Sequence, residues 1–465
     1  MKSNIKICRS HTFWLAIAIS VFLVNQVPFI TDMRPVMYDE AWYANTAYNF
    51  SQGEGFLNTV VGSGGNANFL LPLLTGTMFW IFGYSLFTIR LTAVLCGMIT
   101  MIFLHLCMKE LKSSVEAEVA VLAFFVSITL YNTIFRFGRP ECASIMCMTG
   151  GVWFLLRYMR ENSCGNMIGV ACFTYLATMG HPYALLFFAL AGVWLLVQTI
   201  RSRQWIKIAH LSLLLVAASA AILSMAYISS RYDIASGGNM SARFSMKNIA
   251  VALPEYLKEF FCSKTTLYMI VLLPVIGWCC ANREKRVRTL AYITIAYLIL
   301  FPFLFSTDMM MIGLGADYVA LIGTILIAPC VERVLEFRYK KVYISIFSLY
   351  CVMNFGISYY FNYHVKYEKC NSILENELRA IVPTDAVVFT PLRQYPMVME
   401  NKCYSDHYRG KLPVNYGYII MNSQDKDVYY HTIEIQKQME DYELIYERTS
   451  KQYGMVNVYK NKSKL

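Results

Sequence analysis

Two adjacent carboxylates, Asp39 and Glu40, are the first residues whose type and spacing could support a reaction. They follow the first long apolar run and begin a helix predicted to extend to about Phe50. The ordinary interpretation is structural, since Asp39 would cap this helix and Glu40 would complement its dipole. At a boundary between membrane and water, the same pair could act as a general base or bind a cation. Both interpretations stay open on this stretch alone.

A second candidate is the stretch Gly138-Arg139-Pro140-Glu141. Proline at the first helical position and Glu141 in the first turn favour a helix start, and Arg139 could simply extend to the lipid headgroups. Alternatively, an arginine beside this carboxylate suits a phosphate oxygen. The span count given below places both side chains on the same side of the membrane as Asp39, which favours a shared site.

One histidine and two arginines complete the set of candidate binding residues. His181 follows Gly180 at the outer end of a predicted span. A lone histidine there is more often structural, but this one falls on the same side as the carboxylates. Arg231 and Arg243 belong to the loop 229–263, on a side where positive charge is otherwise sparse. They could hold a lipid-linked phosphate or contact headgroups, and the sequence favours neither.

The composition indicates that membrane helices position these residues. Apolar residues make up 57% of the 465 residues and charged residues only 15%, whereas soluble globular chains are about one quarter charged. The formal net charge is +11, but the basic residues gather in short clusters between apolar runs. This distribution indicates membrane topology and not a nucleic-acid partner. We therefore predict an all-α polytopic membrane protein.

Twelve apolar runs are candidates for spans of about 20 residues. They lie near 11–30, 67–83, 87–108, 118–137, 142–159, 166–180, 183–200, 208–228, 264–281, 289–306, 317–332 and 342–361. The positive-inside rule places the basic N-terminus in the cytoplasm. The later basic clusters are cytoplasmic only if the run 67–83 lies in the membrane interface instead of crossing. The prediction is about eleven transmembrane helices in a domain over residues 1–361, with an outer loop at 31–86.

The remaining residues, 362–465, change in composition and are predicted to form a small extracytoplasmic α/β domain. The expected elements are a helix at 366–381, strands at 386–390 and 418–421, a helix at 428–442, and a hairpin of 443–448 with 455–459.

These motifs, taken together, resemble those of the GT-C membrane glycosyltransferases. The resemblance is strongest to the group of protein O-mannosyltransferases and lipid A aminoarabinose transferase-like proteins, including bacterial dolichyl-phosphate-mannose-type mannosyltransferases. It covers residues 10–200 well, and residues 200–361 only in topology. It rests on Asp39-Glu40 with Ala41-Trp42-Tyr43-Ala44, on Ile81-Phe82-Gly83 up to Arg90, on Gly138-Arg139-Pro140-Glu141 and on His181-Pro182.

The resemblance implies transfer of a sugar from a polyprenyl-phosphate donor to an acceptor hydroxyl. The transfer would take place on the extracytoplasmic face of a bacterial cytoplasmic membrane and invert the anomeric configuration of the sugar. Asp39 and Glu141 would be the catalytic carboxylates, and they could also bind a divalent cation, Mg²⁺ or Mn²⁺. No nucleotide is expected. Many relatives carry Arg-Tyr at the start of a late span where this chain has Asp317-Tyr318, so no phosphate role is assigned there. The implied substrate-binding residues are Glu40, Tyr43, Arg139, His181, Arg231 and Arg243.

Two other functions stay open on the sequence. One is a lipid-linked glycan flippase or transporter without transferase activity, although few ionisable residues lie within the predicted spans, where a transport path usually needs them. The other is a catalytically inert relative that acts as a subunit or receptor, against which the two outer carboxylates argue. The acceptor could be a lipid, a glycan or a protein.

Overall fold

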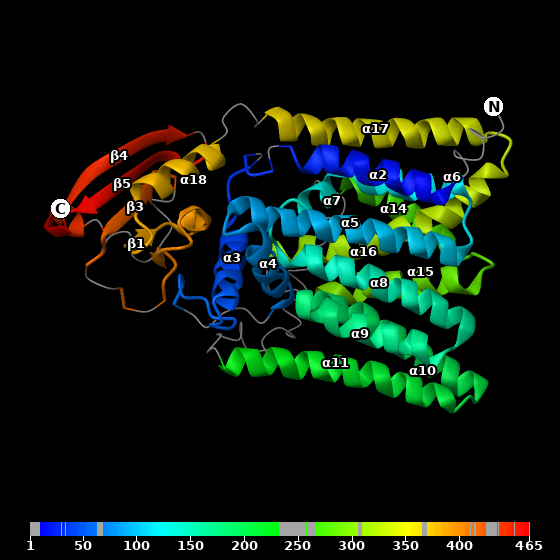
Figure 1. The fold of residues 1–465 in the computed structure, drawn as a ribbon. Coiled ribbons are helices and arrows are strands. Elements are labelled where there is room, and N and C mark those ends of the chain that lie inside the picture. Colours follow the sequence, from blue (N-terminus) through cyan, green and yellow to red (C-terminus); the bar gives the residue numbers. More distant parts are fainter. Residues whose placement is uncertain are drawn as a thin grey trace.

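Long helices packed side by side form most of the chain, and a small mixed sheet lies at one end of this bundle (Figure 1). The computed structural model describes residues 10–464 except 29, 33, 63–67, 232–253, 255–256, 259–265, 306–308, 365–369, 410, 413–414, 425–434, 436 and 451. The helices up to the sheet domain are α2 (His11–Gln26), α3 (Tyr38–Ser51), α4 (Leu70–Phe82), α5 (Leu86–Leu111), α6 (Val115–Ser127), α7 (Thr129–Ile134), α8 (Pro140–Glu161), α9 (Cys164–Gly180), α10 (Tyr183–Ser202), α11 (Ile206–Arg231), α14 (Thr266–Cys279), α15 (Lys285–Phe305), α16 (Met309–Leu335) and α17 (Lys340–His364).

The helices confirm the predicted class, a mostly helical polytopic membrane protein. Seven described helices contain a stretch long and apolar enough to cross a membrane, namely α5, α8, α10, α11, α15, α16 and α17. The other predicted spans correspond to the shorter helices α2, α9 and α14 and to the pair α6 and α7.

The predicted span 118–137 is broken in the structure at Ile128, whose backbone is extended between α6 and α7. Buried amides stabilise the break. Asn132 donates from Nδ2 to the carbonyl of Val126 at 3.2 Å, and its Oδ1 accepts from Asn25 at 2.9 Å and from Gln26 at 2.8 Å. These side chains satisfy polar groups that water cannot reach inside the bundle.

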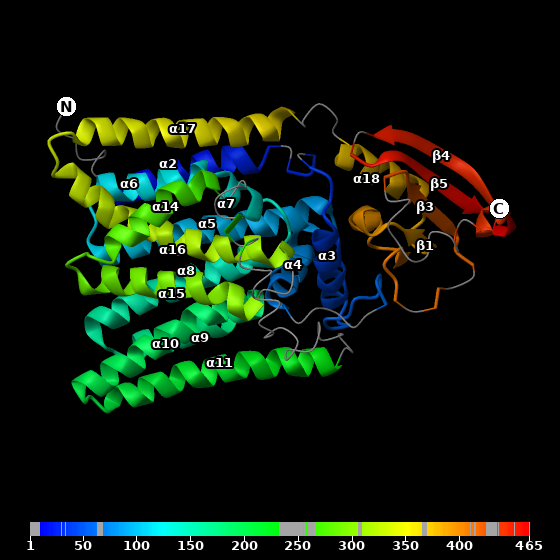
Figure 2. The same cartoon turned by 180° about the vertical axis from the view of Figure 1, so that it is seen from behind.

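The basic clusters lie at the end of the bundle opposite the sheet. The turns between α5 and α6, α8 and α9, α10 and α11, α14 and α15, and α16 and α17 all gather there (Figures 1 and 2). Glu110 joins three of these helices, because its Oε1 lies 2.9 Å from Arg160 on α8 and 3.2 Å from Arg286 on α15. This common placement agrees with the topology derived from the positive-inside rule.

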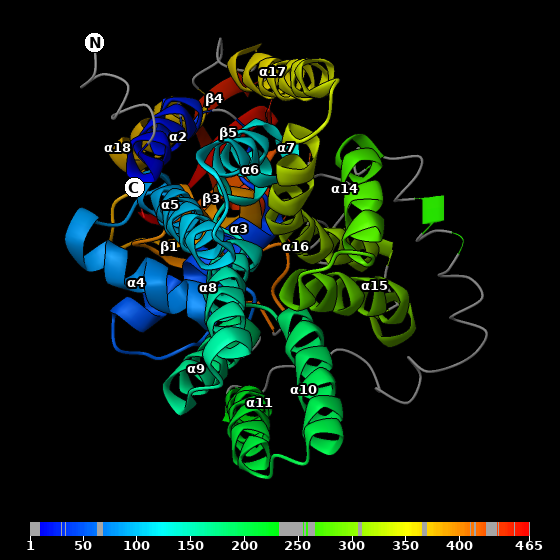
Figure 3. The ribbon, with the colours of Figure 1, turned by 90° about the vertical axis from the view of Figure 1, so that its right-hand side faces the viewer.

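The helices α3 and α4 differ in direction from the rest. Figure 1 shows α3 running across the bundle at the end that faces the sheet, and Figure 3, which looks down the bundle, shows α4 lying across it as well. They pack closely together: Gly76 lies against Phe50, and Trp80 Nε1 donates to the carbonyl of Ser51 at 3.0 Å. This orientation supports the interfacial assignment of the run 67–83.

The C-terminal sheet has the strand order β2-β1-β3-β5-β4. Strand β1 is parallel to β2 and β3, whereas β5 is antiparallel to β3 and β4.

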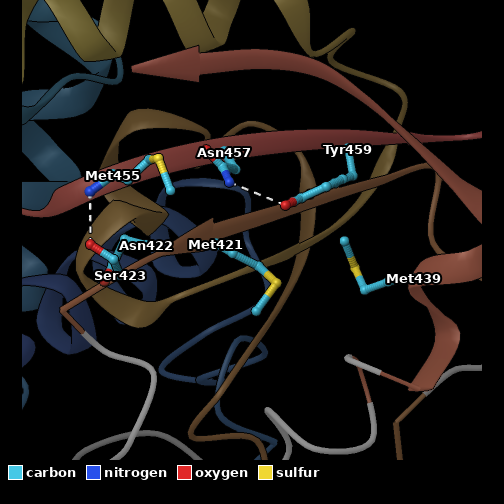
Figure 4. A pocket seen from close by; sticks show the side chains of 7 residues that line it. All are labelled: Met421, Asn422, Ser423, Met439, Met455, Asn457 and Tyr459. Carbon is cyan, nitrogen blue, oxygen red and sulfur yellow. Dashed lines mark hydrogen bonds between the residues drawn. The ribbon is translucent and has the colours of Figure 1, made fainter. Parts of the chain in front are cut away.

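On one face of the sheet, Met421, Met439 and Met455 line a recess of about 290 Å³ (Figure 4). Asn457 lies beside them, and its Nδ2 donates to Tyr459 at 3.1 Å. The elements are α18 (Cys370–Ile381), β1 (Val387–Thr390), η2 (Leu392–Met397), β2 (Lys402–Ser405), β3 (Tyr418–Asn422), η3 (Met439–Asp441), β4 (Tyr442–Ser450), β5 (Gly454–Asn461) and η4 (Lys462–Lys464).

The sheet domain confirms most predicted elements and corrects two. The predicted helix 428–442 lies largely outside the described residues, and its end is wrong because η3 is a single 3-10 turn and Tyr442 begins β4. The strand β2 was not predicted from the sequence. It is a short edge strand. The outer loop pairs with its last residue, because Ser405 N donates to Val60 O at 3.0 Å, and beyond the strand Arg409 N donates to Val61 O at 2.8 Å.

The sheet domain also forms hydrogen bonds with the segment that leads into α3. Asp32 accepts from the backbone and hydroxyl of Ser372, both at 2.8 Å, and so caps α18. Tyr453 accepts from Val36 N at 2.8 Å, and Arg393 Nε donates to Val36 O at 2.9 Å. The start of α3 is therefore fixed from the domain side before the first candidate carboxylate is reached.

Candidate active site

Asp39, Arg139 and Glu141 form a cluster at the end of the bundle that faces the sheet. Arg139 Nη2 lies 3.3 Å from Asp39 Oδ2 and 3.0 Å from Glu141 Oε1. The Glu141 side chain is only 4% exposed, and that of Asp39 is 54% exposed. Within the described part of the chain, Glu141 Oε2 and Arg139 Nε have no hydrogen-bond partner. Buried polar atoms are seldom left in this state, so these two atoms are available to a ligand or a water molecule.

The turn before α8 brings Arg139 and Glu141 to this place. Pro140 occupies the first helical position, and Glu141 follows in the first turn, as their sequence predicts. Gly138 packs so closely on α5 that a Cβ there would lie 2.4 Å from Ile89 Cγ2. Only glycine permits this approach, which docks the turn against the start of α5.

His181 reaches the same region through a second close approach. A Cβ on Gly180 would lie 2.8 Å from the backbone of Ser144, so the end of α9 contacts the first turns of α8. Burial and the guanidinium of Arg139 lower the pKa of His181 to about 3, so this imidazole is neutral at physiological pH. Its Nδ1 faces the backbone N–H of Tyr183 at 3.5 Å, which leaves Nε2 as the hydrogen-bearing nitrogen.

Tyr43 and Asp317 add to the surroundings of Arg139. Tyr43 lies one turn after Asp39 on α3, is buried, and accepts a hydrogen bond from Asn68 at 3.3 Å. Asp317 on α16 is also buried, and both residues interact electrostatically with Arg139. The sequence analysis assigned no role to Asp317, and only the packing of α16 against the bundle brings it here.

Asp39 has a perturbed acidity. Although water reaches about half of the side chain, the surrounding walls reduce its hydration, and this desolvation raises the pKa of Asp39 above its ordinary value. The nearby Glu141 raises the pKa further, whereas the guanidinium of Arg139 opposes the shift. A carboxylate whose pKa is raised toward neutrality is a stronger base than an ordinary aspartate.

Glu40 is enclosed and holds the backbone around the cluster. Its Oε1 accepts from Arg90 Nε at 2.8 Å and from Gly138 N at 3.3 Å. Its Oε2 accepts from Arg90 Nη2 at 3.0 Å and from Met37 N at 3.3 Å. Both side chains of this ion pair are fully buried. These contacts favour a positioning role for Glu40 over the predicted contact with substrate.

A basic region adjoins the cluster and was not identified from the sequence. Arg34 and Arg136 stand near Arg90, five residues before Asp39 and three residues before Arg139 in the chain. Burial, together with the neighbouring guanidiniums of Arg34 and Arg90, lowers the pKa of Arg136 to about 9. Repulsion from neighbouring guanidiniums is a setting in which a bound anion would be favourable.

The two loop arginines are not brought to the cluster by the described residues. Arg231 is exposed at the end of α11, and in the described part of the chain no contact joins it to Asp39 or Arg139. Arg243 lies outside the described residues. Their predicted role in substrate binding stays a prediction.

In the part of the chain that the structure describes, the predicted divalent-cation site at Asp39 and Glu141 has no third ligand. Among the described residues, no group of three or more His, Cys, Asp or Glu side chains is arranged to hold a metal ion. The guanidinium of Arg139 lies between the two carboxylates and supplies positive charge there. These residues do not fit a metal site, and no step proposed below uses one.

The helical bundle, the two crosswise helices and the sheet domain above this cluster define the class: a multi-pass membrane protein with the GT-C fold. Crystal structures of ArnT from Cupriavidus metallidurans, a GT-C lipid A aminoarabinose transferase, are similar to this chain over 96% of its length and 97% of theirs, at 12% sequence identity. The TM-score is 0.61 for the structure bound to undecaprenyl phosphate and 0.62 for the apo state.

One segment of the chain also matches a known protein family. Residues 67–228 match the model of the dolichyl-phosphate-mannose-protein mannosyltransferase family. No curated protein sequence matches this chain at a significant level. The matched segment contains the turn with Arg139 and Glu141 and also His181, so this part of the chain is similar to that family.

Proposed function

We propose that this protein is a membrane glycosyltransferase that moves a sugar from a polyprenyl-phosphate donor to an acceptor hydroxyl. The observation that carries the proposal is the Asp39–Arg139–Glu141 cluster, with its unpartnered buried atoms, at the end of a GT-C bundle. The family match supports the reaction class, and the ArnT structure bound to undecaprenyl phosphate supports a lipid-linked phosphate as the carrier.

In the proposed reaction, Asp39 takes the proton of the acceptor hydroxyl while the oxygen of that hydroxyl attacks the anomeric carbon of the donor sugar. The bond between that carbon and the phosphate oxygen breaks, and polyprenyl phosphate leaves with the bonding electron pair. Attack opposite the leaving group inverts the anomeric configuration. Arg139 lies beside Asp39 at 3.3 Å and donates to the departing phosphate, whose negative charge grows in the transition state.

The basic region beside the cluster gives the phosphate a second source of stabilisation. Arg90 lies close enough to lower the pKa of both Arg34 and Arg136, and Arg90 itself pairs with Glu40 through two short contacts. We infer that the phosphate lies between this region and Arg139, with the lipid tail entering from the bilayer. Glu141 would hold Arg139 in place through the 3.0 Å contact and bind the sugar through Oε2.

The proposed location is the cytoplasmic membrane of a bacterium, with the sheet domain and the cluster on the extracytoplasmic side. This orientation is supported by the basic turns at the opposite end of the bundle. Lipid-linked sugars carry their own leaving group, so the reaction needs no nucleotide on that side.

Removal of divalent cations is expected to leave turnover unchanged. Arg139 occupies the place between the carboxylates where a cation would act, and the described residues supply no third ligand. Transfer is measured in EDTA and again after addition of Mg²⁺ or Mn²⁺. A loss of turnover in EDTA that either ion restores would contradict this prediction and reinstate a metal at Asp39 and Glu141.

The pH profile of kcat/KM is expected to carry the signature of Asp39. A general base acts in its deprotonated form, so activity falls as the pH decreases through the raised pKa of Asp39, above the range of an ordinary aspartate. Arg139 lowers this pKa, so Arg139→Gln should move the acidic limb to higher pH. An acidic limb that persists unchanged in Asp39→Asn would show that another group titrates.

The direct test is a transfer assay with the purified protein, a panel of radiolabelled polyprenyl-phosphate sugars and an envelope extract as acceptor, without nucleotide. Release of polyprenyl phosphate coupled to sugar transfer is the expected result. Donor binding without transfer, combined with movement of donor across vesicle bilayers, would instead establish a flippase.

A further inference from the structure

A cleft of about 710 Å³ lies between α3, the outer loop 54–62 and the edge of the sheet at β2. We call it the α3–β2 cleft. Its volume lies within the range of small-molecule binding pockets. It is lined by Asn45, Tyr48, Asn49, Glu54, Leu57, Asn58, Thr59, Gly62, Tyr395, Met399, Glu400, Asn401, Lys402, Cys403, Tyr404 and Tyr408.

Side-chain hydrogen bonds join the elements that line this cleft. Asn45 Oδ1 accepts from Thr59 N at 2.8 Å, and its Nδ2 donates to Tyr395 OH at 2.8 Å. Asn49 Nδ2 donates to Leu57 O at 3.0 Å. These amides tie the outer loop and the sheet domain to α3, and such preorganisation reduces the entropic cost of binding.

The rim carries aromatic rings and mixed charges. Tyr404 and Tyr408 meet edge to face, with their ring centroids 5.1 Å apart. Burial raises the pKa of Tyr48, and Glu400 and Glu54 nearby raise it further, so its hydroxyl remains a hydrogen donor. Glu400 pairs with Arg379 at 2.9 Å, and Lys402 also lines the cleft. A rim of tyrosine faces, carboxylates and one amine suits a neutral, hydroxyl-rich ligand better than an anion or a lipid tail.

A peptide is a poorer occupant. Peptides commonly bind beside a sheet by pairing with an exposed edge strand. Here the last residue of β2 already pairs with the outer loop, through Ser405 N to Val60 O, and beyond the strand Arg409 N donates to Val61 O. With this end of the edge occupied, recognition through side chains is favoured, by stacking of sugar rings on tyrosine and bonding of hydroxyls to carboxylates.

The cleft and the candidate base lie on one helix but on different faces. Asp39 and Tyr43 are one turn apart on the face toward Arg139, whereas Asn45 and Asn49 face the cleft. With a rise of about 1.5 Å per residue, the cleft begins about 9 Å farther along α3 than Asp39. A ligand that contacts both the cleft and Asp39 must extend along α3 and around it. A single sugar ring is too short to do this.

We propose that the α3–β2 cleft binds a neutral oligosaccharide, and that this glycan carries the acceptor hydroxyl to Asp39. The inference rests on the proposed transferase function and names the acceptor class for it. Sugar rings distant from the reacting hydroxyl would stack at Tyr404 and Tyr408, so the acceptor is recognised several rings away from the point of transfer.

The test measures oligosaccharide binding to the purified full-length protein in nanodiscs. The probes are mannose, glucose and N-acetylglucosamine, each as a series from one to six units, and a serine- and threonine-rich peptide. We expect at least one series to bind, with affinity rising from one unit to three or more. Tyr404→Ala should weaken that binding at least tenfold, and Glu54→Gln, a conservative change at an exposed position, should weaken it several-fold. Tyr339→Ala, an exposed tyrosine at the opposite end of the bundle, is the matched control and should bind as wild type.

Three results would overturn the inference. They are failure of the wild type to bind any series, wild-type affinity in both Tyr404→Ala and Glu54→Gln, and preferential binding of the peptide in a manner that Tyr404→Ala abolishes. Transfer kinetics separate this inference from the proposed function. If turnover requires Asp39 but the cleft variants keep the wild-type KM for the acceptor, only the acceptor site is wrong. If Asp39→Asn turns over normally, the transferase mechanism fails whatever the cleft binds.

Discussion

Asp39→Asn is expected to lower the turnover number by a factor of about 10²–10⁴, the usual contribution of a positioned general base. Asparagine has nearly the same shape, and its amide oxygen can still accept from Arg139, which lies 3.3 Å from Asp39 in the native protein. The substitution therefore removes proton transfer while it preserves the cluster. Donor affinity should change little, because Arg139 and the basic region are proposed to bind the phosphate.

The measurement compares single-turnover transfer and donor binding in the same preparations. Glu443→Gln, an exposed carboxylate on β4, is the matched control and should behave as wild type. Glu141→Gln should also reduce turnover, since Glu141 fixes Arg139 at 3.0 Å. A variant Asp39→Asn that keeps turnover within about threefold of wild type would contradict the assignment of the base, because this loss is far below that of a general base.

The parts of the site that were predictable are those fixed by local signals. Proline at the first helical position and an acidic residue in the first turn predict where α8 begins, and the structure has α8 from Pro140. The basic clusters between apolar runs set the topology, and that topology placed Asp39, Glu141 and His181 on one side. This region became a candidate active site because separate motifs, each recognisable locally, were all predicted to lie on the same side of the membrane.

The parts that were not predictable depend on packing between distant segments. The sequence does not reveal that Glu40 pairs with Arg90, fifty residues away, or that α16 carries Asp317 to Arg139. The apolar pattern of the run 118–137 does not indicate the interruption at Ile128. The buried amides that stabilise the break come from both α2 and α7, and their pairing depends on how these helices pack. The edge strand β2 is four residues long, too short for an alternating pattern to stand out.

Arg90→Met is expected to destabilise the protein by about 3–5 kcal/mol, the usual cost of breaking a buried ion pair from one side. Arg90 and Glu40 are both fully buried, so loss of the guanidinium would strand the carboxylate in a place that water does not reach. Arg90 also donates to the carbonyls of Ile30 at 2.9 Å and Thr31 at 3.0 Å, and these acceptors would lose their partner. The start of α3 would loosen, and turnover should fall with stability because Asp39 is next to Glu40.

A matched comparison decides whether burial is the cause. Arg333 and Glu336 form an ion pair at the opposite end of the bundle, with side chains 57% and 63% exposed, and Arg333→Met should cost at most about 1 kcal/mol. Thermal unfolding of both variants in the same detergent gives the difference. The double variant Arg90→Met with Glu40→Met removes the stranded charge and should recover part of the loss, but not all of it, since the backbone carbonyls stay unpaired. Equal melting temperatures for Arg90→Met and Arg333→Met would show that α3 is held by the sheet domain alone, through Asp32, Tyr453 and Arg393, and that the buried pair does not fix the candidate base.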